Sequence, residues 1–186
     1  MNLPAGLIEA CIENKRSAQQ QLYKCCFGYM MAICLRYERN REDAEFLLNL
    51  SFYKVLTKLH TYKPESPLKP WVKRITVNTI IDEYRKKKTK EVSFDENIDY
   101  SNQNFWTDQA DDNLKAEDLE KLIAQLPETT RKVFNLYAID GYGHQEIGKM
   151  IGLSEGTSKW HLHSARKKLQ ESLRKMQEPR TNAASL

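Results

Sequence analysis

The segment 141–169 restricts the fold more than any other part of the chain. It reads GYGHQEIGKMIGLSEGTSKWHLHSARKKL, with five of the chain's seven glycines in its first sixteen residues and none afterwards. Apolar residues recur at helical spacing up to Ile151, and Gly152 then stands where a helix commonly ends. Ser154 is suited to capping a second helix. The pattern predicts a helix, a tight glycine turn and a second helix.

The two predicted helices differ in what they carry. Gly148 lies inside the first, where glycine costs about 1 kcal/mol relative to alanine, so we expect it to permit the steep crossing of a helix-turn-helix. In the second, Leu162, Ala165 and Leu169 recur at helical intervals, which predicts a buried face. The second helix also carries six cations: Lys159, Arg166, Lys167, Lys168, Arg174 and Lys175. A helical hairpin with a solvated basic face has the same outline, but behind a glycine turn the cations favour a face for phosphates.

Composition indicates an all-α protein. The 186 residues suffice for one ordinary domain or two small ones, and with few glycines, few prolines and no alternating Val/Ile/Thr runs they do not favour strands. The net charge is only +4, so the basic clusters at 69–88 and 159–180 matter more than the total. No stretch approaches the ~20 apolar residues of a membrane span, and the N-terminus does not resemble a signal peptide. We expect a cytoplasmic protein without membrane insertion.

Cysteines and histidines indicate no metal site. The four cysteines lie in the first fifth of the chain, without a CxxC pair, so we expect reduced, partly buried thiols: Cys11, Cys25, Cys26 and Cys34. His161 and His163 are two residues apart on a helix and do not face one another. No catalytic triad, carboxylate pair or phosphate-binding glycine loop is recognisable. We expect no enzyme activity, no metal, no cofactor and no small-molecule substrate.

A break in the middle of the chain predicts two domains. Residues 90–112 carry seven acids against one base, lose the apolar period and are rich in Asn, Asp, Gln and Ser, which is typical of a linker. We therefore expect two small helical domains joined by a flexible acidic linker. The predicted ranges are a helical domain at 4–88, the linker at 89–112, a helix-turn-helix domain at 113–178 and a disordered tail at 179–186.

The segment 71–88, WVKRITVNTIIDEYRKKK, carries the chemistry of the first domain. Its apolar face is Val77, Ile80, Ile81 and Tyr84, and a second stripe holds Trp71, Ile75, Asn78, Asp82 and Arg85. One interpretation places Trp71 and Ile75 in the core and pairs Asp82 with an arginine, Arg85 or Arg74. The other is a nucleic-acid face, because an aromatic ring can stack on a base and an amide can hydrogen-bond base edges.

With both segments placed, the chain resembles the extracytoplasmic-function group of sigma factors, the dissociable promoter-recognition subunits of bacterial RNA polymerase. The stretch LPETTRKVFNLYAIDGYGHQEIGKMIGLSEGTSKWHLHSARKKL is similar to the family's −35-reading domain. The stretch DAEFLLNLSFYKVLTKLHTYKPESPLKPWVKRITVNTIIDEYR is similar to its core-binding and −10-reading domain. The resemblance covers nearly the whole chain, and the acidic linker resembles the segment that threads toward the RNA path.

The resemblance implies roles for particular residues. The helix around 43–56 would dock on core polymerase, through Asp43, Glu45, Asn49 and Phe52. The loop 62–68 and the helix after it would open and hold −10 DNA, through Tyr62, Lys63, Ser66, Trp71, Arg74, Asn78 and Arg85. The helix 155–169 would read −35 DNA, through Ser154, Thr157, Lys159, Trp160, His161, His163, Arg166, Lys167 and Lys168. Within it we expect Lys159, His161 and His163 at base edges and the last three cations on phosphates.

The resemblance also implies function and partners. The chain would bind core RNA polymerase and direct promoter-specific transcription initiation, by recognising the −35 duplex and melting and capturing −10 DNA. An anti-sigma factor is an expected further partner. The alternatives are a stand-alone helix-turn-helix transcriptional regulator with an N-terminal effector domain and a helical enzyme acting on nucleic acid.

Several positions depart from the family's pattern, among them Gly143, which stands where a serine is common near the start of the first motif helix. Phe46 and Leu50 stand where acidic residues are usual in the polymerase-binding helix, so docking should be weaker or more apolar. Trp160 stands where a small residue is usual in the recognition helix, and Ser164 where an arginine is common. The −35 sequence that this chain reads should therefore be unusual.

Overall fold

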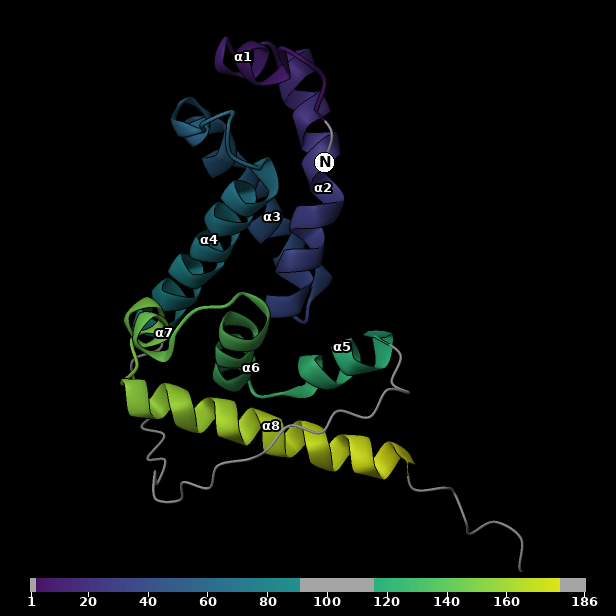
Figure 1. Cartoon of the computed structure of the whole chain (residues 1–186), viewed down its shortest axis with the longest axis vertical. Helices are drawn as coiled ribbons and strands as arrows, with labels where there is room; N and C mark the ends of the chain where they lie inside the picture. The colour runs from purple at the N-terminus through teal and green to yellow at the C-terminus, as the bar shows by residue number, and fades with distance from the viewer. Residues whose placement is uncertain (1–2, 91–115, 178–186) are drawn as a thin grey trace, which may run out of the picture. The chain divides into compact units, whose positions relative to one another are not determined.

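The computed structural model describes residues 3–90 and 116–177, and the chain divides into two compact units, Met1–Phe94 and Asp95–Leu186 (Figure 1). Throughout the described ranges the regular structure is helical, with no strand, so the predicted all-α fold is confirmed. The tail predicted at 179–186 lies outside the described residues, as does nearly all of the predicted linker. The first two residues of the predicted linker, 89 and 90, belong to a helix that ends at Lys90.

The first unit is a helical bundle. Its elements are α1 (Leu7–Ile12), α2 (Arg16–Tyr37), α3 (Arg41–Lys58), the 3₁₀ turn η1 (Leu59–Thr61) and α4 (Leu68–Lys90). The three long helices α2, α3 and α4 each pack against the other two, and α1 packs on α2 (Figure 1). The face predicted as apolar on α4 is buried in this bundle, as expected from its helical period: Val77, Ile80, Ile81 and Tyr84.

Short polar residues set the ends of the first helices. Asn40 precedes α3, and its side-chain oxygen accepts the backbone N–H of Glu42 at 2.9 Å. Asn14 separates α1 from α2 with a φ of 59°, a left-handed conformation that asparagine tolerates better than most residues. The apolar period of the sequence runs across this turn, so the break at Asn14 was not predicted.

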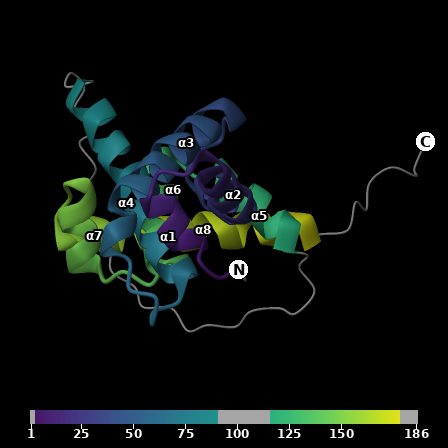
Figure 2. The same ribbon diagram turned by 90° about the horizontal axis from the view of Figure 1, so that it is seen from above.

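The second unit is organised around one long helix. Its elements are α5 (Ala116–Gln125), α6 (Glu128–Phe134), the π-helical turn η2 (Asn135–Ile139), α7 (His144–Ile151) and α8 (Glu155–Gln177). The helices α5, α6 and α7 all pack against α8. In Figures 1 and 2, α7 lies by the N-terminal end of α8 and α5 lies toward its C-terminal half. One side of α8 is thereby covered along most of its length.

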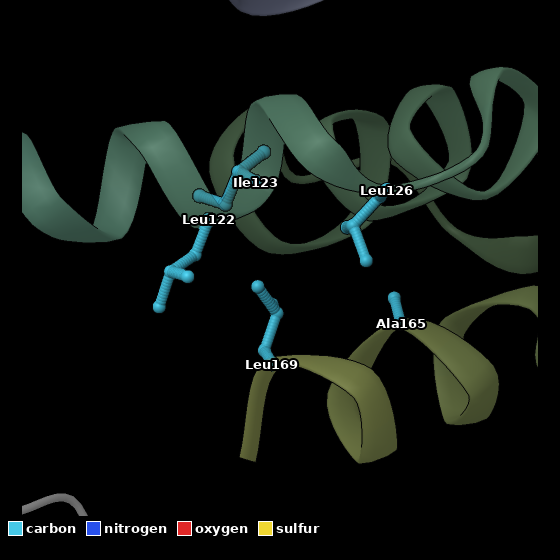
Figure 3. Packing of buried hydrophobic residues seen from close by; sticks show 5 residues of the cluster. All are labelled: Leu122, Ile123, Leu126, Ala165 and Leu169. Atoms are coloured by element: carbon cyan, nitrogen blue, oxygen red, sulfur yellow. The ribbon is translucent and has the colours of Figure 1, made fainter. Parts of the chain in front are cut away.

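Side chains from α5 and α8 meet in the core of the second unit. Figure 3 shows Leu122 of α5, and Leu126 directly after it, directed toward the side of α8 that carries Ala165 and Leu169, and Ile123 belongs to the same buried cluster. All five are at most 8 % exposed, and Phe134 and Leu173 pack against this cluster. Burial of such side chains stabilises each by about 1.5–3 kcal/mol. The face predicted from the spacing of Leu162, Ala165 and Leu169 is therefore confirmed as core.

Candidate nucleic-acid interface

The turn between α7 and α8 depends on two glycines. Gly152 ends α7 with a φ of 72°, which residues with a side chain rarely adopt. A Cβ atom added to Gly148 would lie 2.7 Å from the carbonyl oxygen of Leu153, whose own N–H bonds to the Gly148 carbonyl at 2.9 Å. The close approach predicted at Gly148 is confirmed, but the backbone that approaches is the turn itself rather than α8. The predicted helix, glycine turn and helix are present.

A polar cap fixes the start of α8. The hydroxyl oxygen of Ser154 accepts the backbone N–H of Thr157 at 3.0 Å, and the two hydroxyl oxygens are 2.7 Å apart. The predicted cap is therefore present. The resemblance placed Ser154 and Thr157 at the −35 DNA. In the structure their hydroxyl groups form hydrogen bonds within this cap.

The side of α8 opposite its buried face is basic. All six of its cations are exposed, and four of them lie between positions 159 and 168: Lys159, Arg166, Lys167 and Lys168. Lys159 forms an ion pair with Glu155 at 2.7 Å, and this bond holds the pKa of Glu155 below its usual value. Among the residues that the structure describes, no carboxylate lies within ion-pair distance of the other three. Three unneutralised cations in consecutive positions suit a polyanion.

Two rings accompany these cations. On a helix that turns about 100° per residue, Trp160 and His163 lie on the same outward line as Lys167. Both rings are half-buried, and so is Ser164 next to them. The outward surface of α8 thus combines charge with one large apolar group.

His161 lies on the inner side of α8. Its side chain is only 6 % exposed, and its Nδ1 atom is 3.0 Å from the hydroxyl oxygen of Thr130 in α6. The prediction that His161 reads base edges is therefore wrong, because helical geometry directs position 161 toward α6. Its ring instead contacts Trp160 edge-on, with centroids 5.0 Å apart.

A second histidine, which the sequence analysis did not select, joins α7 to α8. Nδ1 of His144 lies 3.0 Å from the hydroxyl oxygen of Ser158, and its ring stacks on Tyr137 with centroids 4.4 Å apart. Burial lowers the pKa of His144, and the positive charges of Lys159 and Arg166 lower it further, against an opposing effect of Glu155. No local pattern marks this residue, because its partner lies fourteen positions away.

In the first unit, the loop between η1 and α4 folds onto an aromatic pair. The hydroxyl of Tyr62 donates to the backbone carbonyl of Ser66 at 2.6 Å, and the Tyr62 ring lies 5.3 Å from that of Trp71. The structure therefore brings together three residues of the predicted −10 site. Lys63 is exposed on the same loop.

The rest of the predicted −10 stripe follows along α4. Arg74, Asn78 and Arg85 are exposed, whereas Ile75 is buried at 9 % exposure, as the core interpretation expected. The same interpretation paired Asp82 with an arginine, but the structure pairs it with a lysine. It accepts a hydrogen bond from Lys54 of α3 at 3.1 Å, because the packing of α3 against α4 brings this lysine close.

Phe52, predicted to bind polymerase, belongs to the core of the first unit. It is 8 % exposed and meets the ring of Tyr23 edge-on at 4.9 Å, so its predicted role at a surface is wrong. Helical spacing explains the error, since residues 48, 52 and 55 share the inner face of α3. The amide oxygen of Asn49 accepts the Tyr23 hydroxyl at 3.1 Å.

The other two predicted polymerase contacts stay near the surface of α3. Glu45 is exposed and pairs with Arg41 at 2.9 Å, and Asp43 is half-buried.

An apolar stripe covers the outer surface of α3. Phe46 is 59 % exposed and Tyr53 is 64 % exposed, with the half-buried Leu50 between them on the same side of the helix. We call these three residues the α3 stripe. The departures at Phe46 and Leu50 pointed to it, but Tyr53 was not selected, although its spacing of seven from Phe46 was readable.

The cysteines are thiols in the first unit. All four are free, and burial raises the pKa of Cys26 to about 11 and that of Cys34 to about 12, so both stay protonated at neutral pH. The burial expected for these side chains is confirmed, with Cys25 only partly buried. Across residues 3–90 and 116–177, no three His, Cys, Asp or Glu side chains are grouped as metal ligands. No helix in these ranges has the length and apolarity needed to cross a bilayer.

Comparison with known proteins matches each unit to a described protein family. Residues 22–90 match the family Sigma-70 region 2, and residues 116–169 match Sigma-70, region 4. RNA polymerase sigma factor SigV of Bacillus subtilis is 27 % identical over 170 residues, which cover 91 % of this chain and 93 % of the relative. RNA polymerase sigma factor SigZ of the same species is 32 % identical over 130 residues, covering 68 % and 70 %.

Among solved structures, the chain is similar to the sigma factor RpoE, crystallised in complex with the anti-sigma factor NepR from Bartonella quintana. That similarity has 21 % identity and a TM-score of 0.49, and it covers 83 % of this chain and 96 % of the other.

The two matched regions follow one another along this chain in the order region 2, then region 4. Relatives in four bacterial species carry the name RNA polymerase sigma factor, several of them with the prefix ECF. Members of the family are transcription initiation factors. Together with the identity to SigZ over more than two thirds of both proteins, these matches show that the chain belongs to the extracytoplasmic-function sigma factors of the sigma-70 family.

Proposed function

We propose that the chain binds core RNA polymerase in the cytoplasm and directs promoter-specific initiation, without catalytic activity of its own. The observation that carries this proposal is the basic outward face of α8, fixed behind a helix-turn-helix, in the same chain as the aromatic loop before α4. One unit is suited to duplex DNA and the other to unstacked bases. The two together fit an initiation factor better than either does alone.

In the second unit, α8 enters the major groove of the −35 duplex. The N-terminal part of a recognition helix meets base edges, so Lys159, Trp160 and His163 face the bases. The exposed cations Arg166, Lys167 and Lys168 bind phosphates, which fixes the helix in register without reading sequence. Ser154 and Thr157 contribute by capping α8 and thus orienting its first turn.

In the first unit, the Tyr62–Trp71 pair and the exposed side of α4 capture −10 DNA. Aromatic rings stack on single-stranded bases, and each such contact contributes about 1–3 kcal/mol. Arg74 and Asn78 follow Trp71 along α4, where the amide can hydrogen-bond a flipped base. Lys63, Ser66 and Arg85 lie at the ends of this surface and suit the phosphates of the displaced strand.

The surface of α3 docks on core polymerase. Asp43, Glu45 and Asn49 surround the α3 stripe, so the contact combines a polar rim with exposed aromatic groups. Such a composition is typical of protein interfaces, in which aromatic anchors lie among polar neighbours. An anti-sigma factor is a further partner, proposed from family membership alone.

In vitro transcription with purified core polymerase tests the function. Adding the chain should produce transcripts with a defined start from promoters that core polymerase alone does not use. A promoter with a scrambled −35 element is the control and should give no defined start. Absence of promoter-dependent starts with every tested template would overturn the proposal.

The stand-alone regulator is not favoured, because the N-terminal unit matches a sigma-factor region rather than an effector domain. It predicts tight duplex binding by the chain alone. Gel-shift measurements of the same promoter duplex, with and without core polymerase, separate the two functions. The initiation factor should bind weakly until core polymerase is added.

A further inference from the structure

We propose that Trp160 reads thymine in the −35 duplex through an apolar contact with the thymine methyl group, and that His161 positions the indole for this contact. The inference rests on the proposed entry of α8 into the major groove. It adds the chemical identity of one base that α8 recognises.

The position of Trp160 on α8 directs it toward DNA. It lies on the outward line that also carries His163 and Lys167, opposite the face that packs on α5, α6 and α7. One turn before Trp160, Gly156 has no side chain. A Cβ atom at Gly156 would meet only the Ser154 hydroxyl oxygen, at 3.7 Å. The surface beside Trp160 is therefore open at the end of α8 that enters the groove.

The half-buried indole contacts a buried histidine. The hydroxyl oxygen of Thr130 in α6 lies 3.0 Å from Nδ1 of His161, and the imidazole and indole rings meet at an interplanar angle of 78°. His161 is nearly fully buried and therefore cannot itself reach a base. Edge-on aromatic contacts favour one relative orientation of the rings. His161 thus limits the orientations of the indole before DNA arrives, which lowers the entropy lost on binding.

The chemistry of the major groove selects the base. An indole offers a large apolar surface, and among the groups that base pairs present in this groove the thymine C5 methyl is apolar. Cytosine has only a hydrogen in place of this methyl group beside its N4 donor, and adenine and guanine present donors and acceptors at their edges. Burying polar edges under an indole would cost free energy, since their bonds to water would be lost. The contact therefore favours thymine over the other three bases.

Deoxyuridine substitution tests this inference, because deoxyuridine differs from thymidine only by the methyl group. The preferred −35 duplex is first selected from a randomised library with reconstituted holoenzyme. Each thymine is then replaced singly by deoxyuridine, and the affinity is measured. At one or two positions the affinity should fall about threefold to fivefold, the effect expected for one buried methyl group.

Variants assign that effect to the two residues. In Trp160→Ala the thymine-to-deoxyuridine ratio of affinities should fall to about one, while Trp160→Leu, which stays apolar, should keep part of it. In His161→Gln, which can still bond Thr130, the ratio should fall at the same position while the melting temperature stays within a few degrees. Lys168→Ala is the matched control, since loss of a phosphate contact should weaken both duplexes equally. Circular dichroism melting confirms that each variant is folded.

The outcomes are distinguishable from failure of the proposed function. If the wild-type holoenzyme initiates at the selected promoter but shows no methyl-sensitive position, or if Trp160→Ala keeps the full ratio, the thymine contact is overturned and the initiation function stands. A selected −35 duplex without thymine overturns the contact as well. If His161→Gln keeps the full ratio, the positioning role of His161 is overturned. A holoenzyme that initiates at no promoter overturns the initiation function itself.

Discussion

The outward faces of α3 and α8 have opposite chemistry, although each helix buries its other side in a similar core. The face of α3 exposes Phe46 and Tyr53 by more than half of their surface. The face of α8 exposes four cations, three of which have no carboxylate nearby among the described residues. Apolar contact does not weaken in salt, whereas phosphate binding does. Two surfaces of one chain should therefore respond differently to ionic strength, and each prediction below tests that difference or its structural basis.

Removing charge from α8 has the largest expected effect. Substituting alanine for Arg166, Lys167 and Lys168 together should lower the affinity of holoenzyme for promoter DNA on the order of a hundredfold at low salt, and each lost contact should reduce the salt slope by about 0.9. Fluorescence anisotropy of a labelled promoter over a series of salt concentrations measures both quantities. Binding to core polymerase should not change.

The control for this variant is Lys24→Ala, which removes an exposed cation from α2. Its promoter affinity should stay within about twofold of the wild type. An unchanged salt slope in the triple variant would show that these cations do not meet phosphates.

Truncating the α3 stripe tests the apolar side of the comparison. Phe46→Ala combined with Tyr53→Ala should weaken binding to core polymerase by about tenfold to a hundredfold, because exposed aromatic side chains are frequent anchors of interfaces. Biolayer interferometry with immobilised core polymerase measures the affinity at two salt concentrations. The wild-type affinity should change little between them.

The matched control is Leu35→Ala, since Leu35 is also an exposed apolar residue, 43 % exposed, but on α2. It should leave core binding unchanged. If core binding instead falls steeply with salt, the contact at α3 is electrostatic, and the contrast between the two helices fails.

Alanine substitutions at one glycine of each unit compare how closely neighbouring atoms pack around that position. Gly148→Ala should destabilise the second unit by about 1–3 kcal/mol, since its Cβ would lie 2.7 Å from the Leu153 carbonyl oxygen. Gly28→Ala, inside α2 with no atom within 4 Å of the added Cβ, should instead stabilise the first unit by up to about 1 kcal/mol. Hydrogen exchange measured by mass spectrometry locates each effect. Equal exchange in α7 and α8 of wild type and Gly148→Ala would contradict the close approach.

Local signals explain what the sequence predicted correctly. The turn before α8 depends on a left-handed glycine and a serine cap, each acting within a few residues, and the buried face of α4 follows from helical period. The surface roles predicted for His161 and Phe52 came from the resemblance to the family. Both side chains are buried instead, because His161 packs against α6 and Phe52 packs against α2. Pairs such as Lys54 and Asp82, 28 positions apart, leave no local pattern in a single sequence.

The smallest expected effect concerns the contact between His144 of α7 and Ser158 of α8. Burial lowers the pKa of His144 below its unfolded value of about 6.5, so the unfolded chain binds more protons in that range. The free energy of unfolding of the second unit should therefore fall as the pH drops below about 6.5, and the loss should level off below the folded pKa. Because the side chain is only half-buried, solvent screening keeps the effect small. Thermal melting between pH 7.5 and 5.5 measures it.

His144→Gln can keep a hydrogen bond to Ser158 without titrating, so it should flatten this pH dependence, whereas His60→Gln, at an exposed position in the first unit, should not. Because the lowered pKa of His144 belongs to the second unit, we expect its protonation to destabilise that unit. If both variants melt with the wild-type pH profile, protonation of His144 does not weaken the contact between α7 and α8. The basis of any acid sensitivity of promoter binding would then lie in the DNA contacts of α8 rather than in its attachment to α7.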